Sequence, residues 1–272
     1  MEKAWWPNMT PTSSAGQKNG NSPLSFTAGS AKQQGVRGVD LPFRVRLVRT
    51  EDQLYQAVRV RHDAYVRHHP PIVSDRVGVE EEDDKKADAI VLLAESKVDA
   101  APMGSMRVHL NVGEPLIFEK EFDLPSKFRG KALAHITRLA VVGGDPGRLV
   151  KLALFKALHR YCHAFQVDWM LVAGVPPMHR QYVRLGFTDV FEDAQLRPSL
   201  TTANLPARIM GFEVPSAERR WADAAHPLYN FMVRDFHPDI EIFNSVKSMW
   251  SQPRVKKVSA PQGLEMLQIP VV

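Results

Sequence analysis

Apolar and polar positions along the chain predict a β-sheet flanked by helices. Residues 43–49, FRVRLVR, alternate as in a half-buried strand. Thr50 followed by EDQ is a helix N-cap with a capping-box glutamine three residues on, so a helix is predicted from Glu51 to about Val66.

The centre of the chain predicts further strands joined to one long helix. Three strand-like segments come first: AIVLLAES at 89–96, MGSMRVHLNV at 103–112 and AHITRLAVV at 134–142. The glycine-rich GGDPGR ends the last of them, the apolar residues of 148–165 keep helical spacing, and WMLVAGV at 169–175 predicts a buried strand. Strand, glycine loop, helix and strand form a βαβ unit.

The remaining segments set the domain limits. MHRQYVRLGFTDVF at 178–191 predicts a short helix closed by Gly186 and then a strand, and residues from about 194 to 235 predict an added helical segment. Residues 1–40 are rich in small polar residues and predict a disordered tail. One folded domain is therefore expected at 41–235, followed by an extension of uncertain structure at 236–272.

Composition and charge narrow the class of protein. With 44% hydrophobic and 24% charged residues the chain has the balance of a globular protein. It has neither a run of about 18 apolar residues nor a signal-peptide pattern, so a cytoplasmic protein without a transmembrane segment is expected. Cys162 is the only cysteine, and an inert thiol within the long helix is predicted. The net charge of +5 suits an anionic partner, but the basic residues are spread along the chain. The sequence has no basic stripe with interleaved aromatic residues, so binding of nucleic acid is not favoured.

One arginine of the first helix is predicted to face the protein interior. Arg61 shares a stripe of the helix with Leu54 and Val58. A buried guanidinium needs an anionic partner, and the acidic run at 80–84 offers one. From this helix alone, a role at a reaction site and an internal ion pair are equally favoured.

Two further arginines lie on neighbouring predicted strands. Counting by twos puts Arg107 on a polar face with Ser105 and His109. The same count puts Arg138 on the face opposite His135, unless a bulge in the strand re-aims it. Together the arginines indicate an anion in the interior, although each could instead lie at a sheet edge in water.

The glycine-rich segment GGDPGR offers free backbone N–H groups at a helix N-terminus, an arrangement that binds phosphate. It matches neither the P-loop nor the dinucleotide pattern. His159 and His163 lie four residues apart without the glutamate of an HExxH motif, so no metal is expected.

Taken in order, RVRHDAYV, EEEDD, GSMRV, HITRLAVV, GGDPGRLV and MHRQYVRLGFTDV resemble the GCN5-related N-acetyltransferase superfamily. Within it they resemble the acyl-homoserine lactone synthases and, more closely, the N-acyl amino acid synthases. The resemblance implies a mixed, centrally splayed α/β sheet flanked by helices and an acyltransferase domain at 41–235. It implies transfer of a medium or long acyl group from a thioester to the amine of an amino acid.

The resemblance also implies individual roles. Arg61 and Tyr65 look like the R-x-x-x-F pair of the lactone synthases with a tyrosine in place of the phenylalanine, and Asp83 or Asp84 would pair with Arg61. The two strand arginines match those of the family and would hold the acidic run or the acceptor carboxylate. Catalysis would then involve six residues: Arg61, Tyr65, Arg107, His135, Arg138 and Tyr182.

His135 stands where the lactone synthases have a glutamate, and it would act as the base directly or through water, with Tyr182 as the next candidate. The pantetheine arm of the donor would lie between 134–142 and 169–175. Donor-binding positions are expected at Leu139, Val141, Val142, Gly143, Gly144, Arg148, Leu149 and Val150.

The loop lacks the usual Q/R-x-x-G-x-G/A form, so an acyl carrier protein, through its phosphopantetheine thioester, is a better donor guess than acyl-CoA. Contact with a membrane surface stays open. The alternatives are an acyl-homoserine lactone synthase and a non-catalytic sensor of acyl chains or carrier protein on the same fold.

Overall fold

A mixed sheet organises the described part of the chain, which comprises residues 38–68 and 80–243 of a computed structural model. The strand order is β1-β2-β3-β4-β5-β8-β6, with β7 paired to β8. The strands are β1 Phe43–Leu47, β2 Ala89–Ser96, β3 Pro102–Leu110, β4 Leu133–Val141, β5 Trp169–Gly174, β6 Thr188–Asp189, β7 Arg197–Pro198 and β8 Pro206–Glu213. Neighbouring strands are antiparallel except β4 and β5, which are parallel.

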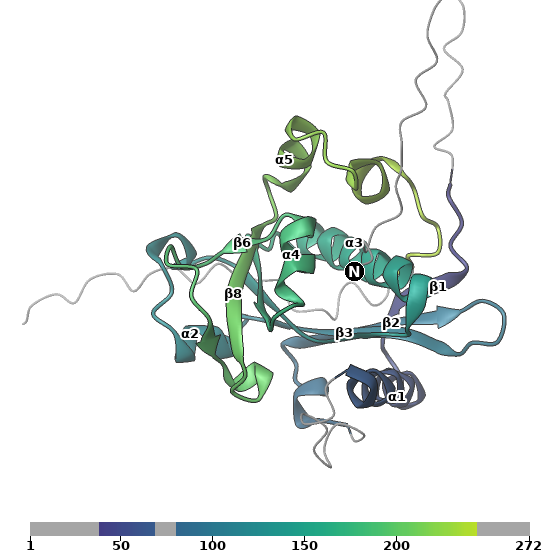
Figure 1. The fold of residues 1–272 in the computed structure, drawn as a ribbon. Helices are drawn as coiled ribbons and strands as arrows, with labels where there is room; N and C mark the ends of the chain where they lie inside the picture. The colour runs from purple at the N-terminus through teal and green to yellow at the C-terminus, as the bar shows by residue number, and fades with distance from the viewer. Residues whose placement is uncertain (1–37, 69–79, 244–272) are drawn as a thin grey trace, which may run out of the picture. The chain divides into compact units, whose positions relative to one another are not determined.

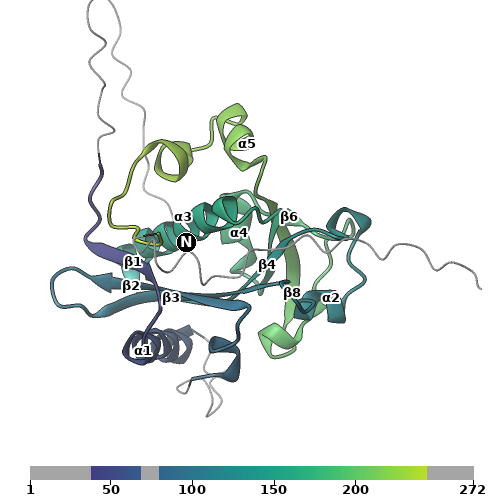
Figure 2. The ribbon, with the colours of Figure 1, turned by 180° about the vertical axis from the view of Figure 1, so that it is seen from behind.

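Helices cover both faces of this sheet. Figures 1 and 2 show α1 (Glu51–His68) on one face and α3 (Gly144–Ala164) on the other. The shorter helices are α2 Ile117–Glu121, α4 His179–Leu185 and α5 Ala217–Asp223, and a π-helical turn spans Asn230–Arg234. Single 3-10 turns are η2 Glu82–Asp84, η3 Ser126–Phe128 and η4 Leu200–Thr202.

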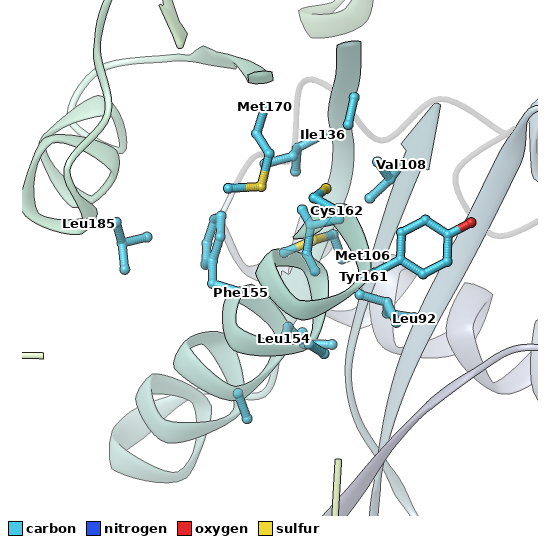
Figure 3. Close-up of a cluster of buried hydrophobic side chains, with 14 of the residues drawn as sticks. Leu92, Met106, Val108, Ile136, Leu154, Phe155, Tyr161, Cys162, Met170 and Leu185 are labelled. Atoms are coloured by element: carbon cyan, nitrogen blue, oxygen red, sulfur yellow. The ribbon is translucent and has the colours of Figure 1, made fainter. Parts of the chain in front are cut away.

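The larger core lies between α3 and the sheet. Figure 3 shows Leu154, Phe155 and Cys162 of α3 among strand side chains such as Met106 and Ile136. Cys162 is fully buried and burial raises the pKa of its thiol, which fits the predicted inert cysteine. A second cluster, built on Phe118, covers the opposite face of β4, β5 and β8.

The parallel pair at the centre of the sheet is short. β4 and β5 are paired only between Leu133–Ile136 and Trp169–Val172. Beyond these residues β4 continues along β3, whereas β5 continues along β8, so the sheet opens at its middle. This confirms the predicted fold class, a mixed and centrally splayed sheet flanked by helices.

A bulge lies in β4 where the sheet opens. Arg107 faces Thr137 and Ser105 faces Ala140, so two β4 residues oppose the single β3 residue between them. The first of these, Arg138, has φ of +52°, a left-handed backbone that side chains other than glycine rarely adopt. The bulge turns Arg138 onto the α1 face, the exception that the sequence count allowed.

Two sequence predictions are corrected here. The segment from 194 to 235 is not mainly helical, because it contains the long strand β8, whose β-branched, aromatic and small residues pair with β5. The long helix begins at Gly144 rather than after the glycine-rich segment, since Pro146 needs no N–H partner in a first turn.

Residues 38–45 and 236–241 lie side by side at the β1 edge. Val39 donates its backbone N–H to Phe236, Val45 donates to Asp239, and Glu241 donates to Val45. The start of the predicted extension is thus tied to the sheet. The rest of that extension and residues 1–37 of the predicted tail lie outside the described residues.

Gly147 in the first turn of α3 leaves no space for a side chain, because an added Cβ would lie 1.8 Å from the Val142 carbonyl oxygen. Gly147→Ala should lower the free energy of unfolding by about 1–3 kcal/mol, since the helix must shift away from β4. Chemical denaturation measures the loss. Gly143→Ala is the control, because nothing lies within 4 Å of its added Cβ; equal stability of the two variants would contradict this packing.

Candidate active site

Arg61 and Asp84 form a buried ion pair beneath α1. One Arg61 nitrogen, Nη1, donates to both carboxylate oxygens of Asp84 at 2.8 and 2.9 Å. The exposed fractions of the two side chains are 3% and 0%. The sequence prediction that the acidic run supplies the partner of Arg61 is confirmed, and the partner is Asp84 rather than Asp83.

Arg107 joins the same acidic turn to β3. Its Nη1 donates to Glu81 at 2.8 Å and to Asp84 at 3.3 Å, and its Nε donates to the Thr137 hydroxyl of β4 at 3.1 Å. Its Nη2 lies 3.6 Å from Asp83. Because Arg107 is as buried as Arg61, these carboxylates are needed to compensate its charge.

Arg138 completes the arrangement from the bulge. Its Nε donates to the second oxygen of Glu81 at 2.8 Å, and its Nη1 lies 3.5 Å from the Thr201 carbonyl of η4. The side chain keeps 29% of its surface exposed, unlike the other two arginines. We call the set of Arg61, Glu81, Asp83, Asp84, Arg107 and Arg138 the charge cluster.

Electrostatics keep the charge cluster ionised at Glu81 and Arg138. Burial by itself would raise the pKa of Glu81, but hydrogen bonds and charges from Arg138 and Arg107 outweigh it and lower the pKa. Burial would likewise lower the pKa of Arg138, but the hydrogen bond to Glu81 and the electrostatic effect of Tyr65 raise it. Arg138 therefore stays a cation at the opening of the sheet.

Two tyrosines of the predicted site come from helices on different faces of the sheet. Tyr65 belongs to α1, whereas Tyr182 belongs to α4 and packs with Phe155 of α3 in the larger core. Burial raises the pKa of Tyr182, and the phenol of Tyr65 adds to this shift. Tyr182 also lies close to Gly174 at the end of β5.

His135 does not fit the predicted role of base. It is 2% exposed, lies opposite His109, and stacks on Phe118 of α2 with ring centroids 3.8 Å apart. Burial lowers its pKa to about 3, with smaller contributions from His109 and Arg107. A base this weak is poorly matched to an amine near neutral pH.

The predicted donor-binding residues differ in how exposed they are in the structure. Gly143 and Gly144 are exposed at the N-terminus of α3, where a first turn leaves backbone N–H groups free. Arg148 pairs with Asp145 at 2.8 Å, while Leu139, Val141, Val142 and Leu149 are partly buried nearby. Val150 is fully buried and packs against Gly104 in the core, so its side chain does not suit donor binding.

Sequence reasoning missed Glu81, which bonds both strand arginines. The acidic run at 80–84 gave no register, and only contact with β3 and β4 distinguishes one carboxylate from the next. Its spacing from Asp84 held a signal, since the two residues cap η2 reciprocally.

The described residues meet neither the requirements of a metal site nor those of a membrane-spanning helix. Among them, no group of histidine, cysteine or acidic side chains has an arrangement that would hold a metal ion. Of the helices in residues 38–68 and 80–243, none combines the length and the apolar character that a membrane span requires.

More than half of the chain matches a known protein family. Residues 56–213 match the family model described as FeeM, N-acyl amino acid synthase FeeM. The solved structure of FeeM, an N-acyl amino acid synthase from uncultured soil microbes, is similar with 16% identity and a TM-score of 0.54 over 70% of this chain and 97% of that chain.

Two further solved structures have lower TM-scores than the FeeM structure. The CoA-dependent acyl-homoserine lactone synthase BjaI, with SAM and isopentyl-CoA, has 17% identity and a TM-score of 0.48 over 68% of this chain and 90% of that one. For aminoglycoside 6'-acetyltransferase type Ii the values are 12% and 0.44 over 62% and 96%. Comparison with the curated proteins gives no match. The resemblance inferred from the sequence motifs is confirmed by the family match.

The buried pair gives a stability prediction. Arg61→Met leaves Asp84 without its closest partner, so the free energy of unfolding should fall by about 3–5 kcal/mol. Arg46→Met, which removes a more exposed pair with Glu95, should cost at most about 1 kcal/mol. Urea denaturation of both variants measures the difference, and similar losses would show that the Arg61 pair contributes no more than a surface pair.

The pKa of His135 gives a pH prediction. The imidazole binds a proton near pH 6.5 when unfolded but only near pH 3 when folded, so stability falls as the pH drops through this range. His135→Gln should remove a slope of up to about 1.4 kcal/mol per pH unit from the unfolding free energy measured between pH 7 and 5. The exposed His62→Gln is the control. An unchanged slope in His135→Gln would mean that His135 titrates normally in the fold.

Proposed function

The chain belongs to the FeeM family of N-acyl amino acid synthases, and from this premise we propose that it transfers a medium or long fatty acyl group to the amine of an amino acid. The donor in this proposal is a thioester on the phosphopantetheine of an acyl carrier protein, with acyl-CoA as the second choice. The observation that carries the proposal is the opening between β4 and β5, with Arg138 in the β4 bulge beside it and Tyr182 packed close to Gly174 at the end of β5.

The donor would enter from the α3 face. Backbone N–H groups of a strand alternate between its two neighbours, so those of β4 that point toward β5 beyond Ile136 have no strand partner there. Such groups can bind the pantetheine amides and polarise the thioester carbonyl. The exposed first turn of α3 supports binding of the phosphate at the end of the arm.

The acceptor would enter from the α1 face. Arg138 is the most exposed of the three arginines in the charge cluster, and its cation suits the carboxylate of an amino acid. Glu81 and the Thr201 carbonyl hold the guanidinium while leaving part of it accessible. Arg61 and Arg107, both buried, are proposed to hold the acidic turn rather than to touch the substrate.

The reaction needs no covalent intermediate. The neutral amine attacks the thioester carbonyl, the carbon–sulfur bond breaks, and the proton lost by nitrogen ends on the departing thiolate. The raised pKa of Tyr182 keeps its phenol protonated at neutral pH, so it can donate to the sulfur but cannot serve as the base. Since His135 is so weak a base, a water hydrogen-bonded to the amine is proposed to relay the amine proton toward the departing thiolate, which is its final acceptor.

Cations near the donor entrance support an anionic carrier. Arg148 lies in the first turns of α3, and Lys151 follows it and donates to Gln181 of α4. Burial lowers the pKa of Lys151 to about 8, with a further contribution from Arg148. Arg67 and Arg180 add exposed positive charge on α1 and next to Gln181.

A rival function is a sensor that binds acyl chains or carrier protein without catalysis. The weak basicity of His135 favours it. A lactone synthase remains the other alternative, and it would require S-adenosylmethionine as acceptor.

An assay of the purified full chain tests the proposal. Thiol release and N-acyl product are measured with acyl-carrier and acyl-CoA donors of several chain lengths and a panel of amino acids. N-acyl amino acid formation from a carrier thioester is expected. Product only with S-adenosylmethionine would indicate a lactone synthase, and donor binding without any product would indicate the sensor.

Substitution of the acceptor arginine tests its role in this assay. Arg138→Gln should raise the apparent KM for the amino acid by roughly 10- to 100-fold, as expected for loss of a charge-assisted hydrogen bond, while the donor KM changes little. Arg59→Gln, on the exposed side of α1, is the control. An unchanged acceptor KM together with a large loss of stability would show that Arg138 is an anchor and not a substrate ligand.

A further inference from the structure

Glu121, the last residue of α2, binds the η4 turn with both of its carboxylate oxygens. Ser199 donates its hydroxyl to Oε2 at 2.9 Å, and Leu200 donates its backbone N–H to Oε1 at 2.6 Å. These are bonds between segments far apart in the chain. No local pattern in the sequence around Glu121 or around Ser199 predicts these two hydrogen bonds.

The η4 turn also has hydrogen bonds of its own. The Ser199 hydroxyl, which lies in a side chain 1% exposed, also accepts from the Thr201 backbone at 3.3 Å. The Thr202 hydroxyl lies 3.0 and 2.8 Å from the Ser199 and Leu205 carbonyls. A turn of so few residues is too short to persist on its own bonds, so both its position and its persistence depend on what holds it from outside.

One end of the Glu121 contact adjoins the charge cluster, and the other packs on the strand that carries Arg138. On one side, the Thr201 carbonyl of η4 lies 3.5 Å from Arg138 Nη1. On the other, Phe118 of α2 stacks on His135, three residues before Arg138 in β4. Glu121 therefore joins η4, which lies beside Arg138, to a helix that packs on the same strand.

We propose that Glu121 is a positioning residue of the acceptor site, which fixes η4 beside Arg138 so that this turn forms one wall of the site. The inference rests on the proposed function, because it takes Arg138 as the ligand of the acceptor carboxylate. Glu121 acts through η4 and does not touch the substrate. Loss of its carboxylate frees the turn and weakens acceptor binding, while donor binding on the opposite face of the sheet is unaffected.

The experiment compares Glu121→Ala with Glu114→Ala, which removes a carboxylate 82% exposed that lies just before α2. In Glu121→Ala the amides of Ser199–Leu205 should exchange hydrogen for deuterium faster, and the acceptor KM should rise by about tenfold, as expected for loss of one bond to a charged group. The donor KM should stay within about twofold. Glu121→Gln keeps an oxygen acceptor for the Leu200 N–H and should recover part of the loss.

Unchanged exchange in Ser199–Leu205 would overturn the anchoring role, and faster exchange with an unchanged acceptor KM would overturn the wall. Should Glu121→Ala fail to fold, Glu121→Gln, which removes the charge and keeps one oxygen acceptor, carries the same test with a smaller expected change. The exchange measurement needs no turnover. A wild-type chain without N-acyl product would therefore refute the proposed function, while the exchange data still decide whether Glu121 holds the turn.

Discussion

The burial of Asp84 is the constraint on which the α1 face of the molecule depends. An unpaired carboxylate in this position would cost several kcal/mol, so the turn that carries it can dock only where cations meet it. Arg61 supplies one from a helix and Arg107 another from a strand. Because Arg107 also binds Glu81, and Glu81 binds Arg138, the position of the exposed arginine follows from the pairing of the buried ones.

The bulge in β4 also helps to direct Arg138 to the α1 face, and it does so with a strained backbone. A non-glycine residue in the left-handed region costs on the order of 1–3 kcal/mol, and Arg138 occupies that region. The charge-assisted hydrogen bond to Glu81 offsets this cost. Without the extra residue, the guanidinium would point toward α3 and the apolar core. The local backbone geometry thus puts a cation on the face where an acceptor can reach it.

Sequence patterns predicted what depends on neighbours in the chain, and failed where distant contacts decide. The limits of β2 follow from its apolar, β-branched run, the N-terminus of α1 follows from capping, and the inward face of α1 identified Arg61. Which carboxylate of the acidic run is buried depends on β3 and β4, so Glu81 escaped notice. The role of base predicted for His135 is disfavoured by its burial against Phe118, a residue of the five-residue helix α2 that no local pattern places there.

The edge of the sheet at β1 links the two ends of the described chain. Leu41 donates its backbone N–H to the Asp239 carboxylate across 198 residues of sequence, and Val45 exchanges backbone bonds with residues 239–241. During synthesis β1, the first strand of the described residues, therefore leaves the ribosome long before residues 239–241, which pair with its outer side. An exposed edge can template pairing with another chain, so crowding on a polysome is the stage at which this fold is most open to aggregation.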